Sequence, residues 1–321
     1  MILDAHSDLF YDVTYRRLIG ETHVLERHHL ARLRRGGVEG LVLSLWSGTG
    51  QGQTFWRDTA WGDPSTAPQR LEVMLACAQE ELHECPAVRL VRTASEAAEA
   101  QAAGCLYAFL GVEGLMPLGK DLTGLHRLAA AGVCTAMLTW NEANALAAGA
   151  GAPDTGLTDL GRQAVRWMER LGMVPDVSHL GDKSFWDLLK ASEGPVIATH
   201  SNCRALCDVR RNLNDDQLRA IRDRGGVVGL NSYHGFVHAD REQQTAETLA
   251  HHAAHMVDVM GVEHVGCGFD FCHFMGPGNE SAQGLEDAGQ IKNLFYWLER
   301  LGMTEREREL IARENFLRVL G

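Results

Sequence analysis

The chain has 321 residues, of which 45% are hydrophobic and 22% are charged, so it has enough material for a large buried core. Its 30 lysine and arginine residues against 42 aspartate and glutamate residues give a formal charge of −12, and no basic stripe offsets this balance, which argues against a nucleic-acid partner. The first residues carry no secretion leader and no segment is apolar enough to span a membrane, so we expect a globular protein without a membrane partner.

The eight cysteines are scattered along the chain. Three of them, Cys105, Cys134 and Cys267, fall inside or beside apolar runs, where cysteine packs as a small hydrophobic residue. No Cys-x-x-Cys pair occurs, so a structural thiolate zinc site is not expected. We therefore expect reduced cysteines and a cytoplasmic location.

Eight short apolar runs recur along the chain, and their lack of a polar face is typical of parallel strands that helices cover on both sides. In chain order the runs are 1–5, 41–46, 106–112, 134–139, 173–178, 196–199, 227–231 and 265–269. Helical periodicity lies between them, most clearly over 158–171, 182–190 and 214–224. Asp182 and Asn214 can cap the second and third of these helices, and Thr304 begins a tail helix with a capping-box pattern.

A strand followed by a helix, eight times over, predicts an α/β protein with a closed (β/α)8 TIM barrel. An open doubly wound sheet could be built from similar pieces, but no G-x-G-x-x-G or Walker motif follows any strand. We expect residues 1–321 to form a single (β/α)8 catalytic domain with C-terminal helices. The Gly-rich segments 48–67 and 141–154 are longer than ordinary connections, so we expect them to form loops over the mouth of the barrel.

Side chains that can bind metal or carry protons follow five of the eight predicted strands. These residues are, in chain order, His6, Asp8, Glu113, His179, His200 and Asp270. Because the C-terminal ends of barrel strands meet at one face, the six side chains should lie close together. Imidazole nitrogens and carboxylate oxygens are ligands that zinc prefers. The sequence therefore predicts a metal site at the mouth of the barrel.

Each of these residues also has a structural explanation when it is considered alone. Glu113 could be a strand-end carboxylate that binds backbone amides, and His179 and His200 could be buried, hydrogen-bonded histidines. Together with His6 they place three imidazoles at one mouth, which favours the metal site. Asp270 could be structural, but at the eighth strand it is well placed to move protons beside a metal.

Six stretches of the sequence follow a known family pattern. They are Gly156-Leu-Thr-Asp-Leu-Gly, Asp176-Val-Ser-His179, Ala198-Thr-His-Ser-Asn-Cys-Arg-Ala-Leu-Cys-Asp208, Arg210-Arg-Asn-Leu-Asn-Asp-Asp216, Val265-Gly-Cys-Gly-Phe-Asp270 and Gly284-Leu-Glu-Asp287. In these stretches the chain resembles the renal (membrane) dipeptidase family of zinc peptidases, among the amidohydrolase-like barrels, and the resemblance implies a TIM barrel of the metal-dependent hydrolase type. The resemblance implies that His6 and Asp8 hold one zinc ion and that His179 and His200 hold the other. Glu113 would bridge the two ions.

The resemblance also implies that Arg211 is the arginine that binds the substrate and that Asp270 is the strand-eight aspartate of the family. Two positions depart from the family pattern. In Thr139-Trp140-Asn141 a tryptophan replaces a histidine that contacts the substrate, and Asp270-Phe-Cys272 lacks the second carboxylate of the family's Asp-Phe-Asp. We expect Trp140 to line the substrate site and to change the range of substrates.

The residues and the resemblance together predict a dipeptidase with two Zn²⁺ ions per chain, in which a shared water is made acidic enough to supply hydroxide. Glu113 and Asp270 would take part in catalysis, and Asp270 would move protons. Arg211 would grip the terminal carboxylate of a small dipeptide. A D-configured second residue and a homodimer are expectations by resemblance. Two alternatives remain, namely hydrolysis of a cyclic amide, lactone or other small substrate, and a metal-binding homologue with weak catalysis.

Overall fold

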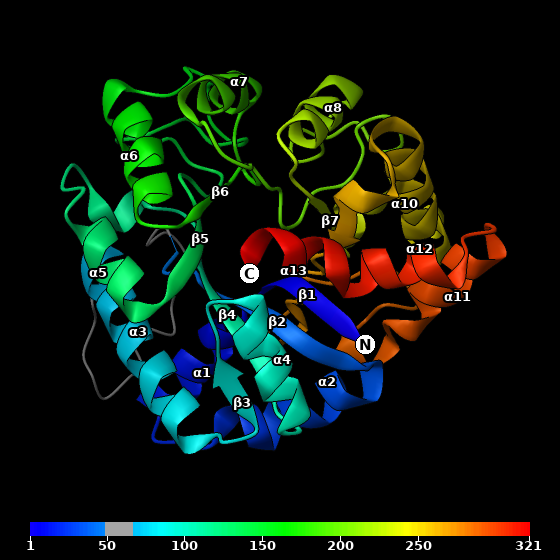
Figure 1. Ribbon diagram of the computed structural model, residues 1–321, viewed down its shortest axis with the longest axis horizontal. Helices are drawn as coiled ribbons and strands as arrows, with labels where there is room; N and C mark the ends of the chain where they lie inside the picture. Colours follow the sequence, from blue (N-terminus) through cyan, green and yellow to red (C-terminus); the bar gives the residue numbers. More distant parts are fainter. Residues whose placement is uncertain (49–66) are drawn as a thin grey trace.

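The structure is a computed structural model and describes residues 1–48 and 67–321. Its strands run parallel in one sheet, with helices around them (Figure 1). The strands are β1 (Ile2–Ser7), β2 (Val38–Leu45), β3 (Val88–Leu90), β4 (Leu106–Val112), β5 (Val133–Met137), β6 (Val174–Asp176), β7 (Val228–Leu230) and β8 (Val265–Cys267). Their order is β6-β5-β4-β2-β1-β8-β7, and β3 pairs with β4 off this path.

Residues 196–199 fill the gap between the two ends of this path. Ile197 makes a parallel bridge to Asp176 of β6, and Ala198 makes a parallel bridge to Val228 of β7. The sheet therefore closes into a barrel, which confirms the predicted fold class. The predicted strand at this position is present only as these two bridges.

Two glycines set the spacing of the strands beside this segment. A Cβ atom at Gly229 would lie 1.9 Å from the carbonyl oxygen of Thr199, and one at Gly268 would lie 1.7 Å from the same atom. A larger residue at either position would therefore push the backbone of Thr199 away and displace His200, which follows it.

Most of the other predicted strands differ from the observed bounds by one to three residues, and two further differences concern β3 and β1. β3 was not predicted, because its three residues form no continuous apolar run and Arg89 is exposed. β1 ends at Ser7, so Asp8 is not a strand residue but precedes the first turn of α1 (Leu9–Leu18). The side chain of Asp8 is therefore oriented by this turn.

The helices surround the barrel and also cross one of its ends (Figure 1). Besides α1 they are α2 (Leu30–Gly36), α3 (Ala67–Glu84), α4 (Ala94–Ala102), α5 (Gly124–Ala131), α6 (Asp159–Arg170), α7 (Asp182–Ala191), α8 (Asp215–Asp223), α9 (His234–Val237), α10 (Ala246–Met260), α11 (Lys292–Arg300), α12 (Glu305–Glu309) and α13 (Asn315–Leu320). The three helices predicted most clearly correspond to α6, α7 and α8.

Two of the predicted helix caps are confirmed and one is wrong. Asn214 and Thr304 cap α8 and α12, and each forms a complete capping box. Asp182 does not cap α7, because it is the first helical residue and its carboxylate binds Arg204. The carboxylate of Asp154, from the segment before α6, instead accepts hydrogen bonds from two backbone N–H groups in the first turn of α7.

Apolar side chains fill the inside of the barrel, and α13 closes one end of it. The buried cluster of strand residues is Leu3, Ala5, Val42, Tyr107, Phe109, Cys134, Ile197 and Val227. Phe316 and Leu320 of α13 belong to the same cluster. A Cβ atom at Gly266 would lie 2.5 Å from the ring of Phe316, so glycine is needed for this close packing.

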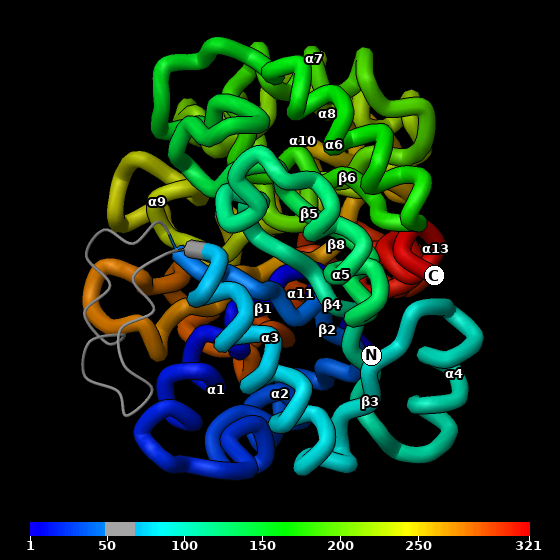
Figure 2. The backbone as a smooth tube through the Cα atoms, turned by 90° about the vertical axis from the view of Figure 1, so that its left-hand side faces the viewer, coloured from blue at the N-terminus to red at the C-terminus, as the bar shows by residue number. Residues whose placement is uncertain are grey.

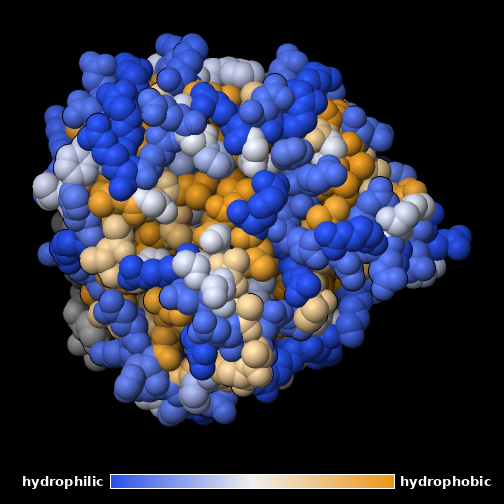
Figure 3. Space-filling view, in the orientation of Figure 1, coloured by the Kyte–Doolittle hydropathy of each residue, from blue (hydrophilic) through white to orange (hydrophobic). Residues whose placement is uncertain are grey.

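The two chain ends lie on one side of the molecule and α9 lies on the other (Figure 2). The face that α13 crosses is hydrophobic near its centre and hydrophilic at its periphery (Figure 3). The eight cysteines are free thiols. In residues 1–48 and 67–321, no helix combines the length and apolarity that crossing a bilayer requires.

Candidate metal centre

The side chains identified from the sequence converge where strand segments end. His6 lies in β1, Glu113 directly follows β4, and Asp270 lies three residues after β8. His179 lies three residues after β6, and His200 follows the bridge segment that closes the barrel. Four of these residues are buried, and Asp270 is partly buried. The barrel thus brings together residues that are nearly 270 positions apart in sequence.

The carboxylate of Glu113 faces three imidazoles, those of His6, His179 and His200. Its Oε1 atom is 2.7 Å from Nε2 of His179 and 3.8 Å from Nε2 of His200. Its Oε2 atom is 3.5 Å from Nε2 of His6. Each oxygen of one carboxylate therefore faces a different part of the cluster, as a carboxylate that bridges two cations must do.

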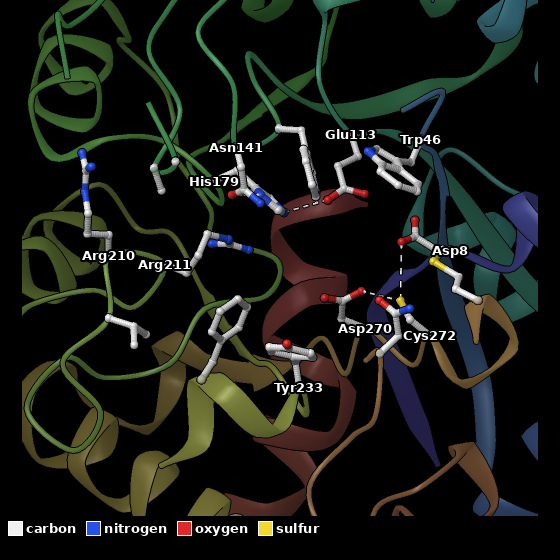
Figure 4. Close-up of a pocket in the computed structure, with 17 residues that line it drawn as sticks. Asp8, Trp46, Glu113, Asn141, His179, Arg210, Arg211, Tyr233, Asp270 and Cys272 are labelled. Atoms are coloured by element: carbon white, nitrogen blue, oxygen red, sulfur yellow. Dashed lines mark hydrogen bonds and ion pairs between the residues drawn. The ribbon is translucent and has the colours of Figure 1, made fainter. Parts of the chain in front are cut away.

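A second group of oxygens surrounds His6. Its Nε2 atom is 3.7 Å from Oδ1 of Asp8 and 4.0 Å from Oδ1 of Asp270. The thiol of Cys272 donates to both carboxylates, at 3.2 Å to Asp270 and at 3.8 Å to Asp8 (Figure 4). His6, Asp8 and Asp270 therefore form a set of closely spaced donor atoms, beside the set formed by His6, Glu113 and His200.

Several ligand atoms in the cluster lack partners although they are buried. Nε2 of His6, Oδ1 of Asp8 and Oε2 of Glu113 accept or donate no hydrogen bond within the described residues. A buried polar atom left unpaired costs roughly 1–3 kcal/mol, so three of them at one place indicate a missing partner. A divalent cation fits this mixture of nitrogen and oxygen donors.

Hydrogen bonds behind the cluster orient two of the imidazoles. Nδ1 of His179 is 2.9 Å from Oδ1 of Asn141, and Nδ1 of His200 is 2.9 Å from the hydroxyl of Thr199. Thr199 donates its own hydrogen to Asp176, so its oxygen accepts from His200. With the hydrogen on Nδ1, the lone pairs of the two Nε2 atoms face each other at 2.9 Å. Outer partners commonly orient metal-binding histidines in this way.

The charges of the cluster favour the binding of a cation. Burial alone would lower the pKa of His6, but the negative charges of Glu113, Asp8 and Asp270 outweigh burial and raise it to about 10. Burial lowers the pKa of His179 to about 3, which keeps this ring neutral and able to act as a ligand. The acidic side of the cluster therefore attracts positive charge, and the other side offers neutral nitrogen.

The backbone is strained at two residues of the cluster. His179 has φ 70° and Asp270 has φ 58°, and among the described residues only one other non-glycine residue has positive φ. Such conformations cost about 1–3 kcal/mol each and gather at functional sites. Both residues line the cavity of the site.

A cavity of about 450 Å³ opens onto the cluster. Buried Arg211 points across it towards Glu113 and Asp270 (Figure 4). Its guanidinium lies 5.2 Å from the centre of the Phe236 ring. Burial lowers the pKa of Arg211 to about 10, so the side chain remains a cation at neutral pH. Nε and Nη2 of this cation have no partner within the described residues, which leaves two donors available for an anion.

A sequence model of the membrane dipeptidase family, peptidase family M19, matches residues 1–321. The chain belongs to this family. The resemblance noted from the sequence is therefore confirmed, and the protein is a hydrolase of the metallopeptidase type.

Three similar proteins agree with this membership. An uncharacterized dipeptidase of Schizosaccharomyces pombe is 36% identical over 218 residues, which are 65% of this chain and 51% of that protein. The crystal structure of a family M19 metallopeptidase, dipeptidase AC, has a TM-score of 0.85 at 26% identity and covers 99% of this chain and 97% of its own. The crystal structure of a metallopeptidase from Rhodobacter sphaeroides, liganded with a phosphinate mimic of the dipeptide L-Ala-D-Ala, has a TM-score of 0.83 at 28% identity. This match covers 99% of the present chain and 98% of the Rhodobacter chain.

Trp140 and Arg211 line the cavity, together with Asp8, Glu113, His179 and Asp270. His6 and His200 lie directly beneath these residues, in contact with Glu113. The predicted loop 141–154 also reaches this place, since Asn141, Ala150 and Gly151 line the cavity. Of the other predicted loop, 48–67, residues 49–66 lie outside the described residues.

The sequence did not identify the residues that support the cluster from behind. Asn141, Thr199 and Asp176 hold His179 and His200, but amide, hydroxyl and carboxylate residues are too common to be recognised by type. A signal did exist, because Asp176 and Thr199 lie within the family-like stretches around the two histidines. Other residues that were not foreseen are Trp46, Tyr233 and Phe236 in the cavity wall and Asn231, which donates to Asp270 at 3.1 Å.

Proposed function

We propose that the protein hydrolyses dipeptides and that two divalent metal ions, zinc foremost, bind per chain in the cluster described above. The observation that carries the proposal is the carboxylate of Glu113, whose two oxygens face separate groups of donors. His6 and Asp8 would hold one ion, His179 and His200 would hold the other, and Glu113 would touch both. The unpaired buried atoms of His6, Asp8 and Glu113 support this assignment.

Zinc ions bound there would lower the pKa of a water molecule and polarise the scissile carbonyl. The protein supplies the remaining functions. The carboxylate of Asp270 would accept a proton from the nucleophile and deliver it to the leaving amine. Asn231 donates to the Oδ2 atom of this carboxylate, and Cys272 donates to its Oδ1 atom, which lies 4.0 Å from Nε2 of His6.

Arg211 would bind the terminal carboxylate of the substrate. Its two unpartnered donors form a planar fork that matches a carboxylate. Because this grip fixes the distance from the carboxylate to the reacting carbonyl, a longer peptide would place the wrong bond at the cluster. The proposal therefore covers dipeptides, with an L- or a D-residue in the second position.

Further parts of the proposal concern the whole protein. Residues 1–321 would form one catalytic domain with C-terminal helices, located in the cytoplasm. A homodimer is proposed from the family resemblance, and sedimentation of the purified protein tests it.

The experiment that tests the proposed function is a screen of purified, zinc-loaded protein against dipeptides with L- and D-residues in the second position. We expect hydrolysis that a chelator abolishes and added zinc restores. Dipeptides with an amidated C-terminus serve as the matched control, because they keep the scissile bond and lose the carboxylate for Arg211. No hydrolysis of any dipeptide would contradict the proposal. Equal rates on amidated substrates and on cyclic amides or lactones would favour the alternative substrate class.

A further inference from the structure

A row of aromatic rings leads from Tyr11 to the cavity, which Trp46, Trp140 and His179 line. The ring centres of Tyr11 and Trp46 are 5.6 Å apart, those of Trp46 and Trp140 are 5.4 Å apart, and those of Trp140 and His179 are 6.0 Å apart. Trp46 and Trp140 are partly exposed and line the cavity. We call these two side chains the indole wall. Exposed tryptophan faces inside a concave site offer a large apolar area for a ligand.

The protein holds the indole wall in place from both sides. Arg70 donates from Nε to the carbonyl of Ser47 at 2.8 Å, which fixes the backbone next to Trp46. Gly149 packs against the backbone of Trp140, where a Cβ atom would lie 2.3 Å from the carbonyl oxygen. A wall that is already ordered costs little additional entropy when a ligand binds to it.

The geometry indicates which part of a dipeptide meets the wall. Arg211 and Trp46 lie at opposite sides of the cavity, and Glu113 and Asp270 lie between them (Figure 4). A dipeptide spans about 7 Å when extended. With its carboxylate at Arg211 and its scissile carbonyl at the cluster, the N-terminal residue extends towards Trp46.

The charges around the cavity restrict that residue further. Among the described residues that line the cavity, the only acidic side chains are Asp8, Glu113 and Asp270, all of which belong to the cluster. A basic side chain at the indole wall would therefore find no separate partner among the described residues of the cavity lining. An apolar side chain would gain from leaving water and from contact with the indole rings.

We propose that the enzyme selects dipeptides whose N-terminal residue carries a bulky apolar side chain, above all an aromatic one, which packs on Trp46 and Trp140. This inference rests on the proposed function and adds the class of substrate to it. By the resemblance noted from the sequence, Trp140 stands where the family pattern has a histidine.

The test compares kcat/KM of the zinc-loaded enzyme for Phe-Ala, Ala-Phe, Lys-Ala and Ala-Ala, each with L- and D-configured second residues. We expect Phe-Ala to exceed Ala-Ala by about tenfold or more, and Ala-Phe and Lys-Ala to gain less. Equal values for Phe-Ala and Ala-Ala, or a larger gain for Ala-Phe or Lys-Ala, would overturn the inference alone. Absence of hydrolysis for all four would overturn the proposed function, and this inference with it.

Variants assign the preference to the wall. We expect Trp140→Leu and Trp46→Leu each to lower the ratio of kcat/KM for Phe-Ala to that for Ala-Ala by at least threefold, and Trp140→Phe to preserve most of it. Tyr296→Leu is the control, because this aromatic residue is 56% exposed on α11, outside the cavity. Since each ratio compares two substrates on one protein, a loss of folded protein cancels. An unchanged ratio in both leucine variants would overturn the inference.

Discussion

Arg211 is an unusual residue because it is a buried cation whose Nε and Nη2 atoms have no partner within the described part of the chain. We expect Arg211→Met to lower kcat/KM for dipeptides by about 10- to 100-fold, because charge-assisted hydrogen bonds to the carboxylate are lost. Arg211→Lys should recover only part of this, since a point charge does not replace the planar fork. Steady-state kinetics on free and amidated dipeptides measure the effect. Equal losses on both substrates would contradict the assigned role.

The same substitution should act on stability in the opposite direction. Burying a guanidinium whose Nε and Nη2 atoms form no hydrogen bond within the described residues is costly, so zinc-loaded Arg211→Met should unfold at a temperature about 2 °C or more above that of the original protein. A lower unfolding temperature would mean that Arg211 is satisfied within the protein and is not held ready for a ligand.

Thr199 acts on the metal cluster only through His200. Its hydroxyl donates to Asp176 and accepts from the imidazole, so Thr199→Val removes the hydrogen bond that orients the ring. We expect zinc affinity, measured by competition with a chelator, to fall by about 10- to 100-fold, and Thr199→Ser to restore it. Thr135→Val is the matched control, because it removes another buried hydroxyl that binds a backbone carbonyl. Equal affinity in Thr199→Val and the original protein would show that the hydroxyl does not position the ring.

At the scale of elements, α10 is joined to the segment after His200 by a buried histidine. Nδ1 of His252 accepts from the backbone N–H of Cys203, and Nε2 donates to the carbonyl of Val237. Burial lowers the pKa of His252 to about 4, and the neighbouring histidines His238, His251 and His255 act in the same direction. The ring is therefore neutral in the folded protein at pH 6.5, where an unfolded chain begins to bind a proton.

The difference between the folded and unfolded pKa values of His252 predicts how the stability of the protein depends on pH. The pKa of His252 is lower in the folded than in the unfolded protein, so its contribution to stability is fully present above about pH 6.5. This contribution is lost as the pH falls towards 4, by roughly 3 kcal/mol. His252→Gln should reduce the loss in the free energy of unfolding between pH 7 and pH 4, measured by urea unfolding. His251→Gln, at the exposed neighbouring position, should change the slope much less, because burial is the main cause of the low pKa of His252. A slope that is equal in both variants would rule out His252 as its source.

The elements also show how far the sequence could lead. Long apolar runs such as β4 were predicted at their observed bounds, because burial on both faces leaves a clear pattern. β3 was missed, and the predicted strand 196–199 is longer than the observed bridges at residues 197 and 198. Segments this short show no distinct period of hydrophobic residues. The cap of α7 comes from Asp154, nearly thirty residues away, and a local pattern cannot reveal such a contact.

At the scale of the whole molecule, the site was predictable because the C-terminal ends of barrel strands meet at one face. Residues that end different strands must meet at one face, and His6, Glu113 and His200 do so although nearly two hundred positions separate the first from the last. The hydrogen bonds from Asn141 and Thr199 to the metal-site histidines, and the pairing of Trp46 with Trp140 at the cavity, could not be predicted in this way. They depend on the packing of side chains whose types occur throughout the sequence.

The most direct test of the account is a crystal structure of the zinc-loaded protein with anomalous diffraction measured at the zinc absorption edge. The account predicts two peaks about 3.5–4 Å apart. One should lie against His6 and Asp8, the other against His179 and His200, with Glu113 in contact with both. A single peak, no peak, or zinc bound away from these five side chains would contradict it.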